Sequence, residues 1–270
     1  MRQARLSANK ATRTIWTPLA RIGIVCSMTA HATRPPRILP CGDSALAVEF
    51  GTGMEVASNR RVLALDRALK LAAITGVSEA VPTYRSLLVH YDPLTLGFSE
   101  LSDRLSALLD EAQPMNGIGR HWRIPVVYGG AFGLDLDTVA AAHGITPDEL
   151  IRRHSAPRYE VAMLGFTPGF SYLRGLDPTI ATPRRSEPRL QTPAGTISIG
   201  GAQAALQCLA GPSGWHLLGR TPVRTFQPQR DPVFLIEPGD TVTFTQIDAA
   251  EFERLERMAE RGDIVAEKLA

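Results

Sequence analysis

The sequence predicts a two-domain α+β protein, in which a small domain of mixed helices and strands precedes a larger domain of short strands. Three observations support this. The chain has 270 residues, 44% of them hydrophobic, which is enough for two cores of ordinary size. Residues 37–118 alternate the apolar periods of strands and helices. After His154 the chain is rich in Gly, Pro and short β-prone runs, which is typical of a barrel or sandwich.

The first domain is expected to span residues 37–118. Its apolar pattern predicts a strand, a helix, two strands and a second helix, and a further strand follows the linker that ends near Gly119. These elements lie at residues 45–50, 56–75, 77–82, 86–91, 101–109 and 122–127. The order β-α-β-β-α-β is that of a ferredoxin-like sandwich. The sequence leaves open which domain the last strand joins.

The second domain is expected over residues 119–248. Two short helices are predicted between residues 136 and 155, because Thr146 to Glu149 combines an N-cap, a proline at the first helical position and a capping-box acid. Short strands are then predicted at residues 196–199, 204–208, 216–218, 233–236 and 241–244. Phe252, Leu255 and Met258 recur at helical spacing, so residues 249–270 are expected to form a helical tail.

Residues 1–36 are expected to be a disordered extension. They are rich in Arg, Thr and Ala and end in Pro35-Pro36, and Met28 is an alternative start, so deletion of residues 1–33 should leave folding intact. The chain has 3 cysteines without ligand spacing, which favours a cytoplasmic location. No stretch approaches the ~20 apolar residues of a membrane span. A net charge of +2 without a basic stripe argues against nucleic acid as a partner.

Residues 164–222 form the candidate site, because they hold more Gly, Pro and Arg than a core needs. Phe166 and Pro168 lie in a glycine-bounded loop that could present rings to a ligand, or could form a tight barrel corner with buried rings. Arg184 and Arg189 lie in the proline-stiffened segment 183–189, which could bind an anion or could be a solvated loop with Glu187 as its counter-ion. Further candidates near glycine turns are Gln203, Trp215 and His216, although a lone His is more often structural.

The sequence lacks the motifs of a self-sufficient enzyme. It has no phosphate-binding G-x-x-x-x-G-K-[ST] loop, and no lysine between Lys70 and Lys268, which excludes a Ser-Lys pair in the second domain. There is no H-E-x-x-H metal motif and no G-x-S-x-G nucleophile elbow. We therefore expect the isolated chain to be inactive.

Several motifs in both domains resemble the family of the B-type subunit of 5-oxoprolinase, also called the KipI or allophanate hydrolase subunit 1 family. The resemblance covers about residues 37–247. It rests on segments at residues 42–43, 81–87, 129–130, 164–173, 183–189, 193–195, 214–215 and 219–222. The last segment adds Arg220 to the candidate binding residues. Two departures fall near the site: Ser213 replaces a usual glycine, and residues 204–207 read Ala-Ala-Leu-Gln instead of a Thr-Gly-Ile-Tyr stretch.

The resemblance implies a cyclophilin-like barrel related to carboxyltransferase domains. It implies a hetero-oligomer with homologues of the A-type and C-type subunits of 5-oxoprolinase, in which ATP, bound through the complex, drives the opening of 5-oxoproline to L-glutamate. A KipI-like protein that inhibits a sensor histidine kinase is the alternative. The equivalent region of a urea carboxylase has less support, because the chain has no biotin-carrier or ATP-grasp segment. Arg184 and Arg189 are expected to contact the substrate carboxylate or a phosphate.

Overall fold

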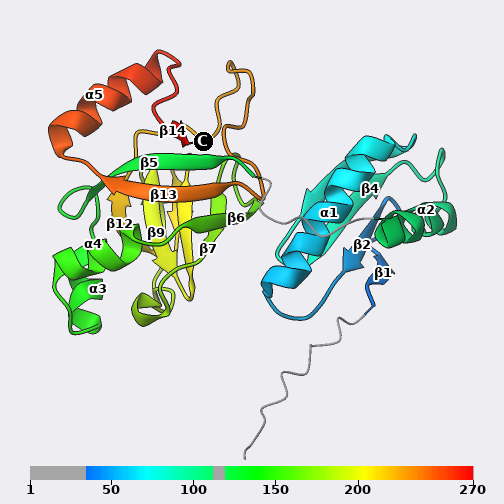
Figure 1. Cartoon of the computed structure of the whole chain (residues 1–270), viewed down its shortest axis with the longest axis horizontal. Helices are drawn as coiled ribbons and strands as arrows, with labels where there is room; N and C mark the ends of the chain where they lie inside the picture. The colour runs from blue at the N-terminus through cyan, green and yellow to red at the C-terminus, as the bar shows by residue number, and fades with distance from the viewer. Residues whose placement is uncertain (1–34, 112–118, 270) are drawn as a thin grey trace, which may run out of the picture. The chain divides into compact units, whose positions relative to one another are not determined.

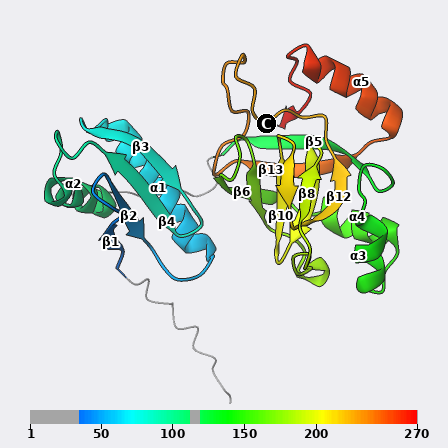
Figure 2. The same cartoon turned by 180° about the vertical axis from the view of Figure 1, so that it is seen from behind.

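The computed structural model of the chain describes residues 35–111 and 119–269 (Figures 1 and 2). The predicted extension therefore lies outside the described residues, apart from Pro35 and Pro36. Among the residues that the structure describes, no helix has both the length and the apolar character that crossing a bilayer requires.

The first part of the chain is a four-stranded antiparallel sheet with two helices. Its elements are β1 (Arg37–Pro40), β2 (Ala45–Glu49), α1 (Val56–Ala72), β3 (Val77–Pro82), β4 (Ser86–Tyr91) and α2 (Phe98–Glu111). The strand order is β1-β2-β4-β3. Alternation in β4 turns Leu87, Val89 and Tyr91 to one face, where they form a single core with Leu65 of α1 and Leu101 of α2. Both helices therefore cover the same face of the sheet.

The expected ferredoxin-like arrangement is not confirmed for this sheet. The strand predicted at residues 122–127 lies in β5 (His121–Tyr128), which belongs to the second sheet of the molecule. The edge position beside β2 is instead occupied by β1, which pairs Ile38 with Val48. Residues 37–40 escaped prediction because a short strand with mostly exposed residues and a terminal proline carries almost no apolar alternation.

The second part is a closed seven-strand β-barrel with helices packed around it (Figure 1). After β5 come α3 (Leu136–Ala142), α4 (Pro147–Ser155), β6 (Tyr159–Leu164), β7 (Ser171–Arg174), β8 (Arg189–Thr192), β9 (Thr196–Gly200), β10 (Gln203–Gln207), β11 (Gly211–Ser213), β12 (His216–Arg220), β13 (Thr241–Gln246), α5 (Ala249–Glu260) and β14 (Glu267–Leu269). The strands follow the order β12-β9-β10-β7-β6-β13-β5, and pairing of β12 with β5 closes the ring. Strands β8 and β11 form a separate two-stranded ribbon.

Strand β5 is the element on which closure depends. It pairs with β13 in parallel from His121 to Val126 and with β12 through Val127 and Tyr128. Its first residues also pair with β14. Helix α5 packs against β5, while α3 and α4 lie at the opposite end of the barrel in both views (Figures 1 and 2).

Most of the predicted elements of the second domain are confirmed. The helix beginning after Thr146 is capped as expected, because the Thr146 hydroxyl accepts from the Glu149 amide at 3.2 Å. The strand predicted at residues 233–236 is wrong: this segment is irregular and forms only a bridge between Phe234 and Phe226. The predicted tail helix is α5, but the residues after it end in β14 rather than in helix.

The two faces of strands β7 and β10 have different roles. Ala204, Leu206 and Leu173 point into the large core of the barrel. Ala205 points to the outer face, where it forms a small second cluster with Phe170 and Trp215, and Tyr172 packs against it. This outer cluster carries the pocket described next.

Candidate functional site

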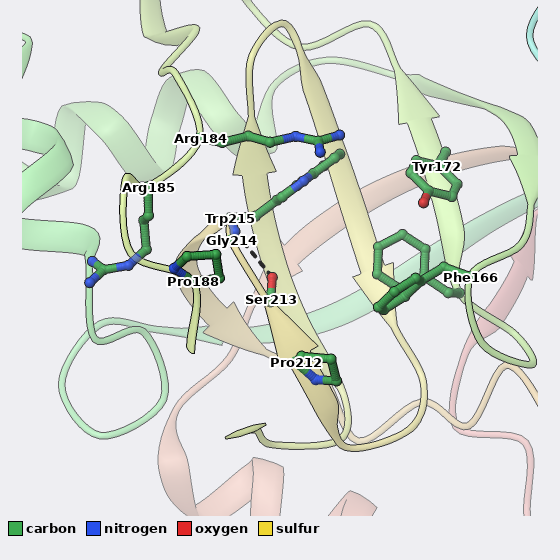
Figure 3. Close-up of a pocket in the computed structure, with 10 residues that line it drawn as sticks. Phe166, Tyr172, Arg184, Arg185, Pro188, Pro212, Ser213, Gly214 and Trp215 are labelled. Atoms are coloured by element: carbon green, nitrogen blue, oxygen red, sulfur yellow. Dashed lines mark hydrogen bonds between the residues drawn. The ribbon is translucent and has the colours of Figure 1, made fainter. Parts of the chain in front are cut away.

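An open pocket of about 230 Å³ lies against the outer cluster (Figure 3). We call it the aromatic pocket. It is lined by Phe166, Phe170, Tyr172, Arg184, Arg185, Pro188, Pro212, Ser213, Gly214 and Trp215. The lining comes from three segments: the loop before β7 together with Tyr172 of β7, residues 183–189, which we call the arginine loop, and residues 212–215 of β11 and its connection to β12. Three of the eight predicted binding residues, Phe166, Arg184 and Trp215, meet here.

Aromatic rings form the apolar part of the pocket. The ring centroids of Phe170 and Tyr172 are 4.7 Å apart, and those of Tyr172 and Trp215 are 6.0 Å apart. Trp215 is buried, and its ring packs on the backbone of Gly200, where a Cβ would lie 2.6 Å from the indole. Burial raises the pKa of the Tyr172 phenol, and the charge of Arg184 only partly opposes this, so the phenol stays a hydrogen-bond donor at neutral pH.

The loop before β7 divides its two phenylalanines between the core and the pocket. Phe170 is buried, whereas Phe166 is 63% exposed, so the alternative of a corner with buried rings holds only for Phe170. Phe166 has a φ of 69°, which bulky residues rarely adopt. A strained, exposed aromatic residue at a pocket is typical of binding sites. Pro168 lies exposed in the same loop, outside the pocket lining.

Arg184 is the pocket's available cation. Its guanidinium carbon lies 5.5 Å from the centroid of the Trp215 ring, within the range of a cation–π contact (Figure 3). The structure gives this guanidinium no acceptor among the residues it describes. A planar guanidinium held over an indole and open to solvent can take a carboxylate with two parallel hydrogen bonds.

The other arginines of the arginine loop are bound to a buried acid. Arg189 donates to both carboxylate oxygens of Asp135, at 2.8 and 2.7 Å, and Arg185 donates to one at 3.2 Å. The Leu217 amide donates to the same carboxylate at 2.8 Å. Burial alone would raise the pKa of Asp135, but the hydrogen bonds and charges of these partners outweigh it, so that the pKa is lowered. The counter-ion of the loop is therefore Asp135 rather than Glu187.

The remaining predicted residues do not line the pocket. Arg189 is engaged by Asp135 as described. His216 places Nε2 2.8 Å from the Pro183 carbonyl oxygen and so fixes the start of the arginine loop. Arg220 lies over the rings of Phe132 and Phe252, and donates to the Ala194 carbonyl at 3.1 Å. Gln203 begins β10 beside Gly200. Their role in binding stays a prediction.

Sequence reasoning missed Asp135, which organises the arginine loop. Its signal is weak, because an aspartate before a helix reads as an ordinary N-cap. It also missed Arg185 and Tyr172 as lining residues, although both belong to segments that had been singled out. Only the fold shows which side of each segment faces the cavity.

The chain is similar in sequence and structure to several known proteins. The profile of the family described as carboxyltransferase domain, subdomain C and D, matches residues 36–236. A protein of Escherichia coli O157:H7, named as the B-type subunit of 5-oxoprolinase, is 40% identical over 204 residues, which cover 75% of this chain and 92% of that protein. The crystal structure of TTHA0988 matches 76% of this chain, with 36% sequence identity and a TM-score of 0.69. The present chain spans only 40% of TTHA0988.

A more distant structure supports the fold alone. The Kluyveromyces lactis urea amidolyase shares 20% identity with a TM-score of 0.72, over 87% of this chain and 16% of that protein. The likeness agrees with a closed barrel of the cyclophilin-like kind. The comparisons do not favour the kinase-inhibitor alternative.

Proposed function

The chain belongs to the family of the B-type subunit of 5-oxoprolinase, and from this premise we propose that it is one component of an ATP-dependent complex that opens 5-oxoproline to L-glutamate. In this reaction the lactam C–N bond is broken, water supplies the oxygen of the new carboxylate, and ATP hydrolysis drives the step. The partners are the A-type and C-type subunits. ATP enters the reaction through the complex, and the sequence of this chain has no G-x-x-x-x-G-K-[ST] phosphate-binding loop.

The observation that carries the proposal is the pairing of Arg184 with Trp215 in the aromatic pocket. 5-Oxoproline has one carboxylate and a small ring. The free guanidinium suits the carboxylate, and the aromatic walls suit the ring. The Tyr172 phenol is a donor within the same lining. The chain thus contributes substrate binding and orientation, and the remaining groups of the reaction come from the assembled complex.

The test is Arg184→Ala in the complex reconstituted with both partner proteins. We expect kcat/KM for 5-oxoproline to fall, because a charge-assisted contact to the substrate is lost. The decrease should correspond to a loss of about 2–5 kcal/mol in transition-state stabilisation. The KM for ATP should stay unchanged. The melting temperature should change little, because among the described residues this guanidinium has no acceptor, and its exposed cation–π contact with Trp215 is worth only about 0.5–1 kcal/mol. Arg184→Lys keeps the charge but loses the paired N–H donors of the guanidinium, so its kcat/KM for 5-oxoproline should lie between those of the parent and of Arg184→Ala.

Arg152→Ala is the matched control. Arg152 is an exposed arginine of α4 whose partner is Glu149, and surface pairs of this kind are worth little. Full activity of Arg184→Ala in the complete complex, with glutamate release equal to that of the control, would show that the pocket does not bind the substrate.

A further inference from the structure

We propose that Asp135 is a positioning residue for the aromatic pocket, and that it makes the pocket selective for a singly charged carboxylate. The inference rests on the proposed function, since it concerns how the same pocket recognises its ligand. Asp135 does not line the cavity. It acts through Arg185 and Arg189, which both follow Arg184 in the arginine loop.

Asp135 uses its carboxylate for the loop rather than for its own helix. The residue stands at the N-cap of α3, where an aspartate side chain normally accepts from the first helical amides. Here it makes no side-chain cap hydrogen bond. Its two oxygens accept from Arg185, Arg189 and the Leu217 amide, which come from two other segments of the barrel domain.

The carboxylate therefore joins three segments at one buried point. These are the start of α3, the arginine loop and the start of β12, the strand that follows Trp215. Further hydrogen bonds complete the anchoring: Arg185 N donates to the Gly214 carbonyl at 2.8 Å, and His216 Nε2 lies 2.8 Å from the Pro183 carbonyl. Because Arg184 lies between Pro183 and Arg185, its direction toward Trp215 depends on these contacts. Loss of the Asp135 contacts should loosen Arg184 without removing any group from the pocket.

The same contacts set which guanidinium donors a ligand meets. Arg185 lines the pocket, but its guanidinium is paired with Asp135. Arg189 is paired too, which leaves Arg184 as the unpaired cation among the described lining residues. The one carboxylate of Asp135 balances only one of these two charges, so the selectivity comes from hydrogen-bond donors: Asp135 occupies those of Arg185 and Arg189 that face it, and the open fork of Arg184 matches one carboxylate. A phosphate carries more charge and more acceptors, and it is usually met by several cations or backbone amides.

Asp135→Asn in the reconstituted complex tests both parts of the proposal. The amide keeps the shape of the side chain and removes its charge, so Arg185 loses its counter-ion and the loop loses its anchor. We expect the KM for 5-oxoproline to rise about tenfold or more, with kcat changed less than threefold and the KM for ATP unchanged. We also expect the Ki of inorganic phosphate, measured against 5-oxoproline, to fall at least threefold.

Asp240→Asn is the matched control, because Asp240 is another buried aspartate of the barrel with a bidentate arginine partner, and it lies outside the aromatic pocket. It should lower the melting temperature by a similar amount and leave the KM for 5-oxoproline and the phosphate Ki within twofold of the parent. If Asp135→Asn changes these two constants no more than Asp240→Asn does, Asp135 is only structural and the proposal is overturned.

If Asp135→Asn does not fold, a second variant tests the role of Asp135. Arg189→Lys retains the charge pair and gives up one of the two hydrogen bonds, and we expect the KM for 5-oxoproline to rise at least threefold. An unchanged KM in that variant would contradict the proposal. The outcomes also separate the two proposals: an Arg184→Ala complex with full activity removes the binding role of the pocket, whereas a defective Arg184→Ala with a normal Asp135→Asn removes only the role of Asp135.

Discussion

Two buried aspartates of the barrel domain have nearly the same surroundings and different consequences. Asp135 and Asp240 each accept from two nitrogens of one arginine and from at least one backbone amide. Asp240 also accepts from the indole of Trp122 at 3.1 Å. Its partners, Arg120 and Glu237, lie at the start of β5 and in the turn before β13, two strands that pair with each other. Asp240 thus holds β5 and β13 together.

Asp135 fixes the arginine loop, and this loop carries Arg184, which has no acidic partner among the described residues. The difference shows that the chemistry of a buried ion pair does not reveal its role; what matters is whether the fixed segment also presents a group to a cavity. Around Asp240 the one arginine, Arg120, pairs with Asp240 and lies 3.6 Å from Glu237, so it has acidic partners within the strand junction. Around Asp135 the two paired arginines stand beside Arg184, which is left for a ligand.

The largest expected effect is on stability, and it should be shared by both sites. Asp240→Ala and Asp135→Ala each leave a partly buried guanidinium without its counter-ion, so we expect each to lower the free energy of unfolding by about 3 kcal/mol. Urea denaturation of the isolated chain at neutral pH measures this. A cost below about 1 kcal/mol at either site would mean that water replaces the aspartate there, and the likeness of the two sites would then be only geometric.

His154 differs from both aspartates, because it is a buried ionisable group with no counter-ion among the described residues. His154 is fully buried against Phe244 and Tyr159, with Nδ1 2.9 Å from the Tyr128 hydroxyl. Burial lowers its pKa to about 3, whereas an unfolded histidine has a pKa of about 6.5. Between these values only the unfolded chain binds the proton. The contribution of His154 to stability is therefore complete above pH ~6.5 and declines as the pH falls toward 3.

Asp135 titrates in a different window. Its lowered pKa means that its stabilising contribution is complete above the unfolded value of about 3.9 and is lost only below it. The free energy of unfolding of the parent falls between pH 7 and pH 5. In His154→Gln we expect this fall to be smaller by about 2 kcal/mol, because no buried imidazole has to stay neutral. Phe244→Leu, which removes the stacked ring and keeps the imidazole, should be less stable at both pH values with the parent's difference between them. If His154→Gln keeps the parent's difference, the imidazole is not held neutral in the fold.

The smallest expected effect comes from disturbing the pocket without touching either carboxylate. A Cβ at Gly200 would meet the Trp215 ring at 2.6 Å, so Gly200→Ala should displace the indole from Arg184. We expect a KM for 5-oxoproline about tenfold higher, which corresponds to about 1.4 kcal/mol. Gly165→Ala is the control in a pocket loop, because an added methyl there meets no atom within 4 Å. Equal KM values for the two variants would exclude Trp215 from binding.

Local signals in the sequence were enough to predict much of the fold. The strands at residues 77–82 and 86–91 coincide with β3 and β4, and the capping sequence at Thr146 begins α4 as expected. These elements carry strong local signals, namely apolar alternation and cap chemistry. The strand at residues 122–127 was found, but its sheet was not, because pairing with β13 is a contact between distant parts of the chain that no local pattern encodes.

The candidate site was predicted less completely. The composition of residues 164–222 located the pocket, and Phe166, Arg184 and Trp215 line it. The sequence treats Arg184 and Arg189 alike, whereas the structure pairs Arg189 with Asp135 and gives Arg184 no acidic partner among the described residues. Two arginines five residues apart look equivalent in sequence. Which one faces a buried acid is decided by tertiary packing, here by a residue 54 positions away.

The dependence of barrel closure on β5 has a consequence for how the chain folds during synthesis. Asp240 and Arg120, which join β13 to β5, are 120 residues apart in sequence. β14 then adds residues up to Leu269 to the same strand. The four-stranded sheet is complete within residues 37–91, so its strands can pair while the barrel is still being translated. The barrel must wait until its last strands have left the ribosome, and its edges remain open to chaperones or to other nascent chains until then.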